Sequence, residues 1–167
     1  RGIGQTRLNI TLDGIPLQDP EDQALYFSNV GDLASVVDSI QVQRGVGTSS
    51  VGSASYGGSV NLATVNPAED AGVDVQLGGG SWGTARAGVA VHSGRLGGGV
   101  ALYGRLSSQT SDGFRDHAFA RQQSAYYGAT RHTPDSALKI FGFIGRTRTG
   151  LSYLATDEAV LTGDLRR

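Results

Sequence analysis

The chain divides into two stretches by its pattern of hydrophobic and polar positions. Up to about residue 67, short alternating runs are mixed with loop signals and one helical signal. The alternating runs, which predict strands, are Arg7–Leu12, Asp38–Arg44 and Ser59–Val65. Gly31–Val37 predicts about two turns of helix, because Leu33, Val36 and Val37 would share one side. This mixture predicts an α+β arrangement for the first stretch.

From about residue 72 onward the alternation becomes regular. Val73, Val75 and Leu77 fall on one face, and Asp74 and Gln76 fall on the other. Further runs lie at residues 85–92, 100–107, 122–131 and 137–148. The last two carry aromatic residues on both faces. The pattern predicts about five antiparallel strands, which fit either a sheet with one wet face or the wall of a membrane barrel.

The connections between these predicted strands alternate in length. Residues 93–97 and 132–136 are typical of tight turns, whereas residues 109–121 and 149–167 are long and polar. The first hairpin, at Gly78–Gly83, is short. Short connections that alternate with long ones are typical of outer-membrane barrels, which have short periplasmic turns and longer external loops.

Composition narrows the class of protein. The 167 residues include 26 glycines, and only 38% are hydrophobic and 17% charged, which suits short strands joined by many turns. The net charge of −1 gives no reason to expect nucleic-acid binding. The absence of cysteine excludes disulfides and thiolate metal sites. No stretch approaches the ~20 apolar residues of a transmembrane helix, but barrel strands need an apolar residue only at every second position.

Five motifs resemble those of TonB-dependent outer-membrane receptors. They are Asn9–Leu17, Val37–Gly45, Gly52–Leu62, Gly80–Thr84 and Ser111–Asp116. Each motif is common by itself, but here they follow the order and the spacing of the family and span nearly the whole chain. The family's Arg-Gly-Pro is Arg44-Gly45-Val46 here, and its Ile-Gly-Gly is Tyr56-Gly57-Gly58. Both departures retain the glycines that shape the loop.

The resemblance implies a fold and a location. The fold is a mixed α+β plug over residues 1–67, followed by antiparallel strands of a transmembrane β-barrel over residues 72–167. A barrel of this family has about 22 strands, so about five strands form only a part of one. Both ends of the chain are therefore interpreted as truncations. The implied location is the bacterial outer membrane.

The resemblance also implies uptake of a scarce nutrient, such as an iron–siderophore complex or cobalamin. The implied partners are TonB with its inner-membrane energising proteins, the outer-membrane lipid and the nutrient chelate. No cofactor, metal or enzymatic activity is expected, because no cluster of acid, base and nucleophile is legible. The alternatives are a soluble β-rich binding or adhesion module and a transducer with an additional signalling domain. Nothing in the sequence names the substrate.

The resemblance makes a few residues weak candidates for substrate contact, because plug loops that face outward touch the substrate in this family. They are Tyr26, Phe27, Thr48, Ser49 and Ser50. The acidic segment Gln18–Phe27 lacks the ligand spacing of a calcium loop, so a solvated loop is the simpler interpretation. Trp82 and Tyr103 could belong to the aromatic girdle of a barrel.

The remaining candidates concern the plug itself. The resemblance implies that Arg44 pairs with barrel carboxylates and helps to latch the plug, and a buried Arg needs such partners. The alternative is an Arg that ends a strand in solvent. Glycines at the plug turns should allow tight turns and a close approach to the barrel wall. They are Gly14, Gly45, Gly57 and Gly58. No Lys and no helix follow Gly57-Gly58, so a phosphate-binding loop is a poor interpretation.

Overall fold

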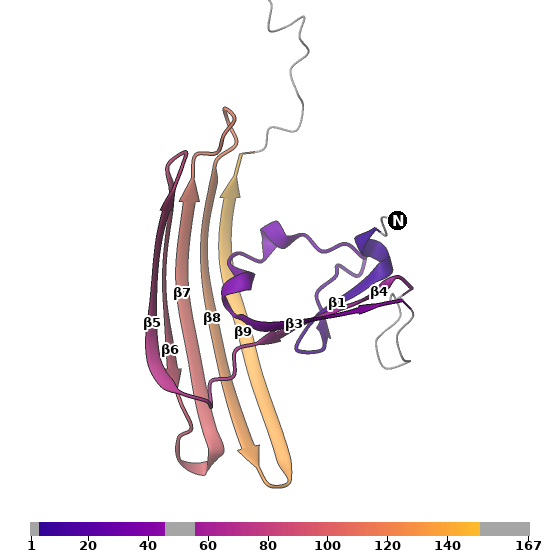
Figure 1. Cartoon of the computed structure of the whole chain (residues 1–167), viewed down its shortest axis with the longest axis vertical. Coiled ribbons are helices and arrows are strands. Elements are labelled where there is room, and N and C mark those ends of the chain that lie inside the picture. Colours follow the sequence, from indigo (N-terminus) through magenta and orange to yellow (C-terminus); the bar gives the residue numbers. More distant parts are fainter. Residues whose placement is uncertain (1–3, 46–55, 151–167) are drawn as a thin grey trace, which may run out of the picture.

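The computed structural model describes residues 4–45 and 56–150, which form two sheets (Figure 1). The first sheet has the strand order β2-β1-β4-β3. Its strands are β1 (Leu8–Leu12), β2 (Ile15–Pro16), β3 (Val37–Arg44) and β4 (Gly58–Thr64). β1 runs parallel to β4, and the other pairs are antiparallel. Single turns of 3-10 helix accompany them: η1 (Gln5–Arg7), η2 (Phe27–Asn29) and η3 (Leu33–Ser35).

The second sheet contains five antiparallel strands in chain order. They are β5 (Ala71–Gly80), β6 (Thr84–Ser93), β7 (Val100–Ser111), β8 (Ala120–Thr133) and β9 (Ser136–Thr149), with a 3-10 turn η5 (Gly97–Gly99) before β7. Strands of 10 to 14 residues are long enough to cross a bilayer when tilted. Within the described residues, no helix has the length and apolarity needed to cross a membrane.

The two ends of the second sheet differ in their connections. The end called here the loop end carries the connections of residues 81–83 and 112–119, and the opposite turn end carries residues 94–99 and 134–135. The last strand also finishes at the loop end (Figure 1). The predicted alternation of short and long connections is only partly present: the connection at 134–135 is tight and that at 112–119 is long, but residues 94–99 form a longer connection than the tight turn expected there. β7 and β8 take up part of the long connection expected at residues 109–121.

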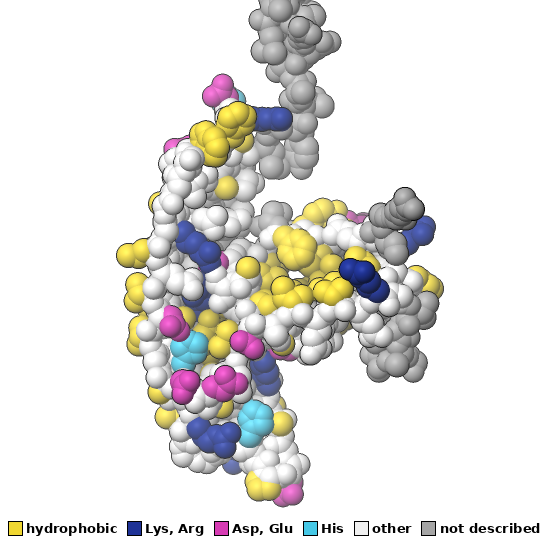
Figure 2. Space-filling view, in the orientation of Figure 1, with side chains coloured by type: hydrophobic (Ala, Val, Ile, Leu, Met, Phe, Trp, Pro, Cys, Tyr) yellow, Lys and Arg dark blue, Asp and Glu magenta, His cyan; other side chains and the backbone are white. Residues whose placement is uncertain are grey.

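Strand register separates the second sheet into an outward and an inward face. One continuous row across the five strands is apolar and largely exposed: Val75, Val89, Leu106, Ala125 and Ile144. The adjacent row points to the other side: Asp74, Ala90, Arg105, Tyr126 and Phe143. Hydrophobic side chains project from the outer side of β5 in the space-filling view (Figure 2). The division matches that of a barrel wall, with lipid outside and the lumen inside.

The first sheet lies against the inward face of the second sheet (Figure 1). A buried apolar cluster joins them: Leu12, Leu33, Val36, Leu62 and Tyr126. Tyr103 and Phe141 of the second sheet pack against this cluster. Leu12 and Val36 are the most deeply buried large side chains, at 1% and 2% exposure. The hydrophobic contact between the sheets therefore fixes the first unit at one place on the wall.

Two local expectations are wrong. Residues 31–37 form only the 3-10 turn η3, because Asp32 adopts left-handed backbone angles (φ 58°, ψ 24°) and β3 already begins at Val37. Tyr103 does not belong to an outer girdle, since it lies on the inward face and packs against the buried cluster. In both cases contacts between the two sheets override the local pattern.

Candidate functional site

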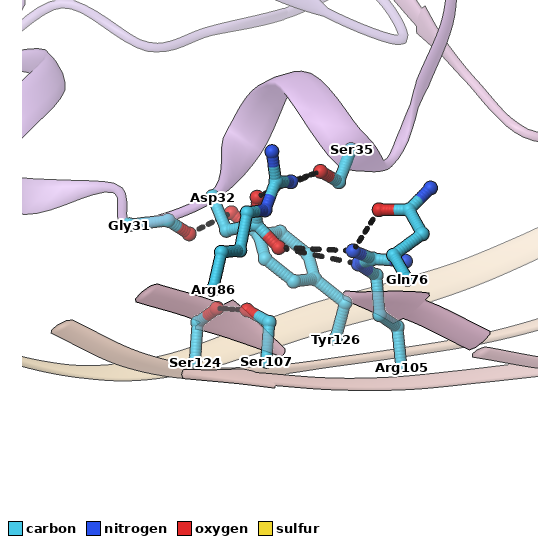
Figure 3. Close-up of polar contacts among 9 residues, drawn as sticks. All are labelled: Gly31, Asp32, Ser35, Gln76, Arg86, Arg105, Ser107, Ser124 and Tyr126. Atoms are coloured by element: carbon cyan, nitrogen blue, oxygen red, sulfur yellow. Dashed lines mark hydrogen bonds and ion pairs between the residues drawn. The ribbon is translucent and has the colours of Figure 1, made fainter. Parts of the chain in front are cut away.

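Asp32 stands at the centre of a polar contact between the two sheets (Figure 3). It lies at the start of η3, and its side chain is 8% exposed. Arg86 of β6 donates from Nη2 to Asp32 Oδ1, and Arg105 of β7 donates from Nε and Nη2 to Oδ2, each at 3.2 Å. Ser35 donates its hydroxyl to Oδ1 at 2.7 Å. One carboxylate of the first unit is thus held by two arginines of neighbouring wall strands.

Arg105 is the more deeply buried of the two arginines. Its side chain is 2% exposed, whereas that of Arg86 is 37% exposed. Gln76 of β5 accepts a further hydrogen bond from Arg105 Nη2 at 2.9 Å. A buried cation requires partners, and loss of one member of such a pair costs about 3–5 kcal/mol. The pairing of Asp32 with Arg105 is therefore expected to contribute more than the partly solvated pairing with Arg86.

Tyr126 links this polar contact to the apolar cluster. Its ring belongs to the cluster, and its hydroxyl donates to the carbonyl oxygen of Gly31 at 3.0 Å. The residue before Asp32 is thereby tied to β8. Nearby, the hydroxyls of Ser107 and Ser124 lie 2.7 Å apart on neighbouring strands (Figure 3). The loop that enters η3 is held to β6, β7 and β8 together.

The contacts of Asp32 keep its carboxyl ionised. Burial by itself would raise its pKa, but the hydrogen bond from Ser35 and the charges of Arg86 and Arg105 outweigh burial and hold the pKa below its ordinary value. The folded state therefore gains stability from this ionised group at all pH values above the ordinary pKa. That contribution is lost as the pH falls through the lowered pKa.

A second ionic contact joins the two sheets at β9. Lys139 donates from Nζ to Asp13 Oδ2 at 2.9 Å and to the Thr64 hydroxyl at 2.7 Å. Thr64 in turn donates its backbone N–H and its hydroxyl to Asp13, at 3.0 and 2.7 Å. Burial opposes ionisation of Asp13, yet the contacts with Lys139 and Thr64 lower its pKa. Lys139 is 36% exposed, so solvent weakens this pair.

The structure brings only some of the predicted site residues near the wall. Tyr26 and Phe27 are exposed at 51% and 56%, close to η2, which packs beside β9 on the side of the first sheet nearer the loop end (Figure 1). Thr48, Ser49 and Ser50 lie outside the described residues. Substrate contact by these five residues stays a prediction.

Arg44 lies exposed at the end of β3. Its pairing with barrel carboxylates likewise stays a prediction. The ion pairs that the structure does place between the two sheets have the opposite polarity, with carboxylates on the first unit and cations on the wall. The sequence carried one signal for them: Arg86 and Arg105 fall on the polar face of strands whose other face is apolar. No sequence signal points to Asp32, because it lies within the segment Gly31–Val37, for which the pattern predicts a helix.

The predicted plug glycines occupy turns and a close strand contact. Gly14 and Gly45 have positive φ values of 83°, and Gly57 donates its N–H to Arg7 O at 2.9 Å. Gly58 has φ 146°, and a Cβ there would collide with the Gln43 carbonyl oxygen. The close approach that Gly58 permits is thus to β3 of the same sheet.

Among the residues that the structure describes, no three His, Asp or Glu side chains gather where they could hold a metal ion. The site is a buried ionic contact between the two units. A five-stranded sheet that is apolar on one face and polar on the other, with a second folded unit held against the polar face, is typical of part of a plugged outer-membrane barrel receptor.

Comparisons with known proteins agree with this class. Residues 1–59 match the family model described as the TonB-dependent Receptor Plug Domain. The ferripyoverdine receptor of the outer membrane of Pseudomonas aeruginosa, bound to ferripyoverdine, has 26% identity and a TM-score of 0.66. The alignment covers 83% of this chain and 19% of that one. No curated protein sequence matches closely enough to count as a relative.

Two further solved structures share the fold. The siderophore receptor PirA from Pseudomonas aeruginosa is 22% identical with a TM-score of 0.62, over 89% of this chain and 28% of that one. The FpvAI–pyocin S2 complex gives 24% identity and a TM-score of 0.65, over 83% and 19%. The chain therefore spans about a fifth to a quarter of the length of these proteins. The plug-domain match over residues 1–59 and the likeness to outer-membrane siderophore receptors support a fragment of a TonB-dependent receptor, and they confirm the predicted fold class.

Proposed function

We propose that the whole protein imports a scarce chelated nutrient across the outer membrane, with TonB and its inner-membrane partners supplying the energy. Residues 1–67 act as the later part of the plug, and residues 72–167 as the first barrel strands. An iron–siderophore complex is the favoured substrate over cobalamin, because the similar structures include receptors for siderophores. The chain performs no covalent chemistry in this proposal.

The observation that carries the proposal is the fastening of the plug unit to the inner wall. Arg86 and Arg105 hold Asp32 from two strands, and Tyr126 holds the backbone beside it. Such a contact suits a seal that stays closed at rest and yields when pulled. Hydrogen bonds and ion pairs of this kind re-form once the force is removed, so the plug can return to its place after each cycle.

Substrate acts in this scheme by biasing the plug between its seated and displaced states. A ligand can shift such an equilibrium only through a difference in affinity for the two states. Tyr26, Phe27 and the Thr48–Ser50 segment are proposed to supply contacts that differ between them. Arg44 is proposed as a further latch toward barrel strands beyond this chain.

Uptake by cells that carry the full-length receptor tests the function. The receptor would be expressed in a strain without siderophore receptors of its own, and cells would be given iron-55 siderophores or labelled cobalamin. We expect accumulation of one iron chelate in cells with TonB, and surface binding without accumulation in cells that lack TonB. Accumulation without TonB, or accumulation of cobalamin alone, would contradict the proposal or its preferred substrate, respectively.

A variant pair tests the proposed contact residues. Replacement of Tyr26 and Phe27 together by Ala should weaken chelate binding to the full receptor by about tenfold, the equivalent of ~1.4 kcal/mol. Replacement of the exposed Phe114 in the 112–119 connection by Ala removes one exposed aromatic ring elsewhere and provides a control. Equal binding by the double variant and the wild type would remove these two residues from the site.

A further inference from the structure

Three arginines gather on the outward face of the wall near its loop end. Strand register places Arg121 of β8 directly opposite Arg148 of β9, and Arg146 is the next outward residue along β9. All three are exposed. These positions alternate with the inward-facing Gln122 and Thr147. The arginines therefore point away from the plug, toward the surroundings of the barrel.

The arrangement concentrates positive charge at one spot. Like charges directly opposite each other on neighbouring strands repel and destabilise the sheet. Within the described parts of β8 and β9, the outward positions include no Asp or Glu. An anion that lies between Arg121 and Arg148 would relieve the repulsion. Arginine suits phosphate in particular, because its planar guanidinium group can donate two parallel hydrogen bonds.

An aromatic ring keeps the two opposed arginines together. The guanidinium carbons of Arg121 and Arg148 each lie 6.0 Å from the centre of the Phe119 ring. The carbonyl oxygen of Phe119 accepts a hydrogen bond from Gly150 N at 2.8 Å, which ties the start of β8 to the end of β9. Both cations are thus positioned before any ligand arrives, which lowers the entropy lost on binding.

Directly next to the arginines, the outward face forms a shallow apolar groove. Val75, Leu77, Leu106 and Ile144 line it, and Arg146 lies at its rim. Leu77 is 81% exposed and Ile144 is 69% exposed. A ligand that fits both features is amphiphilic, with an acyl chain for the groove and an anionic group for the arginines.

The opposite end of the same face offers a contrast. Arg131, near the turn end of β8, lies opposite Leu138 rather than another cation. The basic cluster therefore belongs to the loop end alone. Long connections are external in outer-membrane barrels, so the cluster is expected at the level of the outer leaflet.

We infer that Arg121, Arg146 and Arg148 form a binding site for the phosphate groups of an acylated lipid in the outer leaflet. The phosphates lie between the arginines, and an acyl chain lies in the groove beside Leu106 and Ile144. The inference depends on the location of the protein in the outer membrane. It does not depend on the nutrient that the receptor carries.

Native mass spectrometry of the full-length receptor in detergent tests the site with lipid A as the probe. The variant replaces Arg121, Arg146 and Arg148 by Gln, and the matched control is Arg131→Gln on the same face. We expect about a tenfold loss of lipid A affinity in the triple variant and none in the control, since tenfold corresponds to ~1.4 kcal/mol. The wild type should bind dephosphorylated lipid A with a similarly reduced affinity. If the triple variant does not assemble, Arg148→Gln alone removes the opposed pair and should still weaken binding.

Two results would overturn the inference. Lipid A that binds the folded triple variant or Arg148→Gln as tightly as the wild type would show that the arginines do not hold it. Complete displacement of lipid A by millimolar inorganic phosphate would instead assign the site to free phosphate and remove the lipid.

Discussion

Two ionic contacts among the described residues fasten the plug unit to the barrel wall, one at Asp32 and one at Asp13, and they differ in burial. Around Asp32, the carboxylate is 8% exposed and Arg105 is 2% exposed, with Gln76 and Ser35 completing the hydrogen bonds. At Asp13, the partner Lys139 is 36% exposed. A buried pair is costly to break because one charge remains without a partner, whereas water replaces the partner of an exposed one. The Asp32 contact should therefore determine how firmly the plug is held.

The largest effect is expected from Asp32→Asn in the full receptor. The change nearly preserves shape but leaves Arg105 buried without a counter-charge, at a cost of about 3–5 kcal/mol. Hydrogen exchange at η3 should accelerate, and the ionic conductance of the receptor in planar bilayers should rise. Wild-type exchange and conductance in this variant would mean that the contact does not hold the plug.

A smaller effect is expected from Gly88→Ala on β6. A Cβ at Gly88 would lie 2.8 Å from Arg105 Nη2, so the guanidinium must shift from the position in which it holds Asp32. We expect a loss of about 1–3 kcal/mol in the stability of the plug contact, as is usual for overpacking. The matched control is Gly104→Ala on the outward side of β7, where a Cβ meets no atom within 4 Å. Equal thermal and exchange profiles for the two variants would refute this role of Gly88.

Less still is expected from Lys139→Gln. The pair with Asp13 is partly solvated, so its loss should cost at most about 1 kcal/mol. Amide exchange in β1 and β4 is the measurement to make, because Asp13 and Thr64 lie at the ends of those strands. A loss as large as that of Asp32→Asn would reverse the ranking of the two contacts.

The smallest effect is expected from mild acidification. The pKa values of Asp13 and Asp32 are both lowered from 3.8, so both groups stay ionised from pH 7 to pH 5. Their contribution should be lost only as the pH falls below about 4, the ordinary pKa of Asp, and through the lowered values. Conductance that rises already between pH 7 and pH 5 would point to other titrating groups.

Strands within the second sheet and contacts between the two units differ in how well the sequence predicts them. Alternation along β5–β9 assigned Val75 and Arg105 to opposite faces, because each strand must present one side to lipid and one to the plug. Inward residues of one strand pair with inward residues of the next, so each strand shows the same division into two faces at every second position. The five strands and their turns were therefore predictable from local patterns.

Contacts between the two units were not predictable in this way. Residues 31–37 have the apolar spacing of a helix, yet Asp32 turns left-handed and pairs with arginines 54 and 73 residues away. No local pattern encodes a partner at that distance. Arg44 drew attention through a family motif, whereas the fastening that the structure places lies at Asp32.

A double-mutant cycle between Asp32 and Arg105 tests the central claim most directly. Asp32→Asn, Arg105→Gln and the double variant of the full receptor would be compared by hydrogen exchange at η3. If the pair holds the plug, the double variant should be less destabilised than the sum of the single variants, with a coupling of about 1–3 kcal/mol. If the effects of the two single variants sum to that of the double variant within about 0.5 kcal/mol, the account is contradicted.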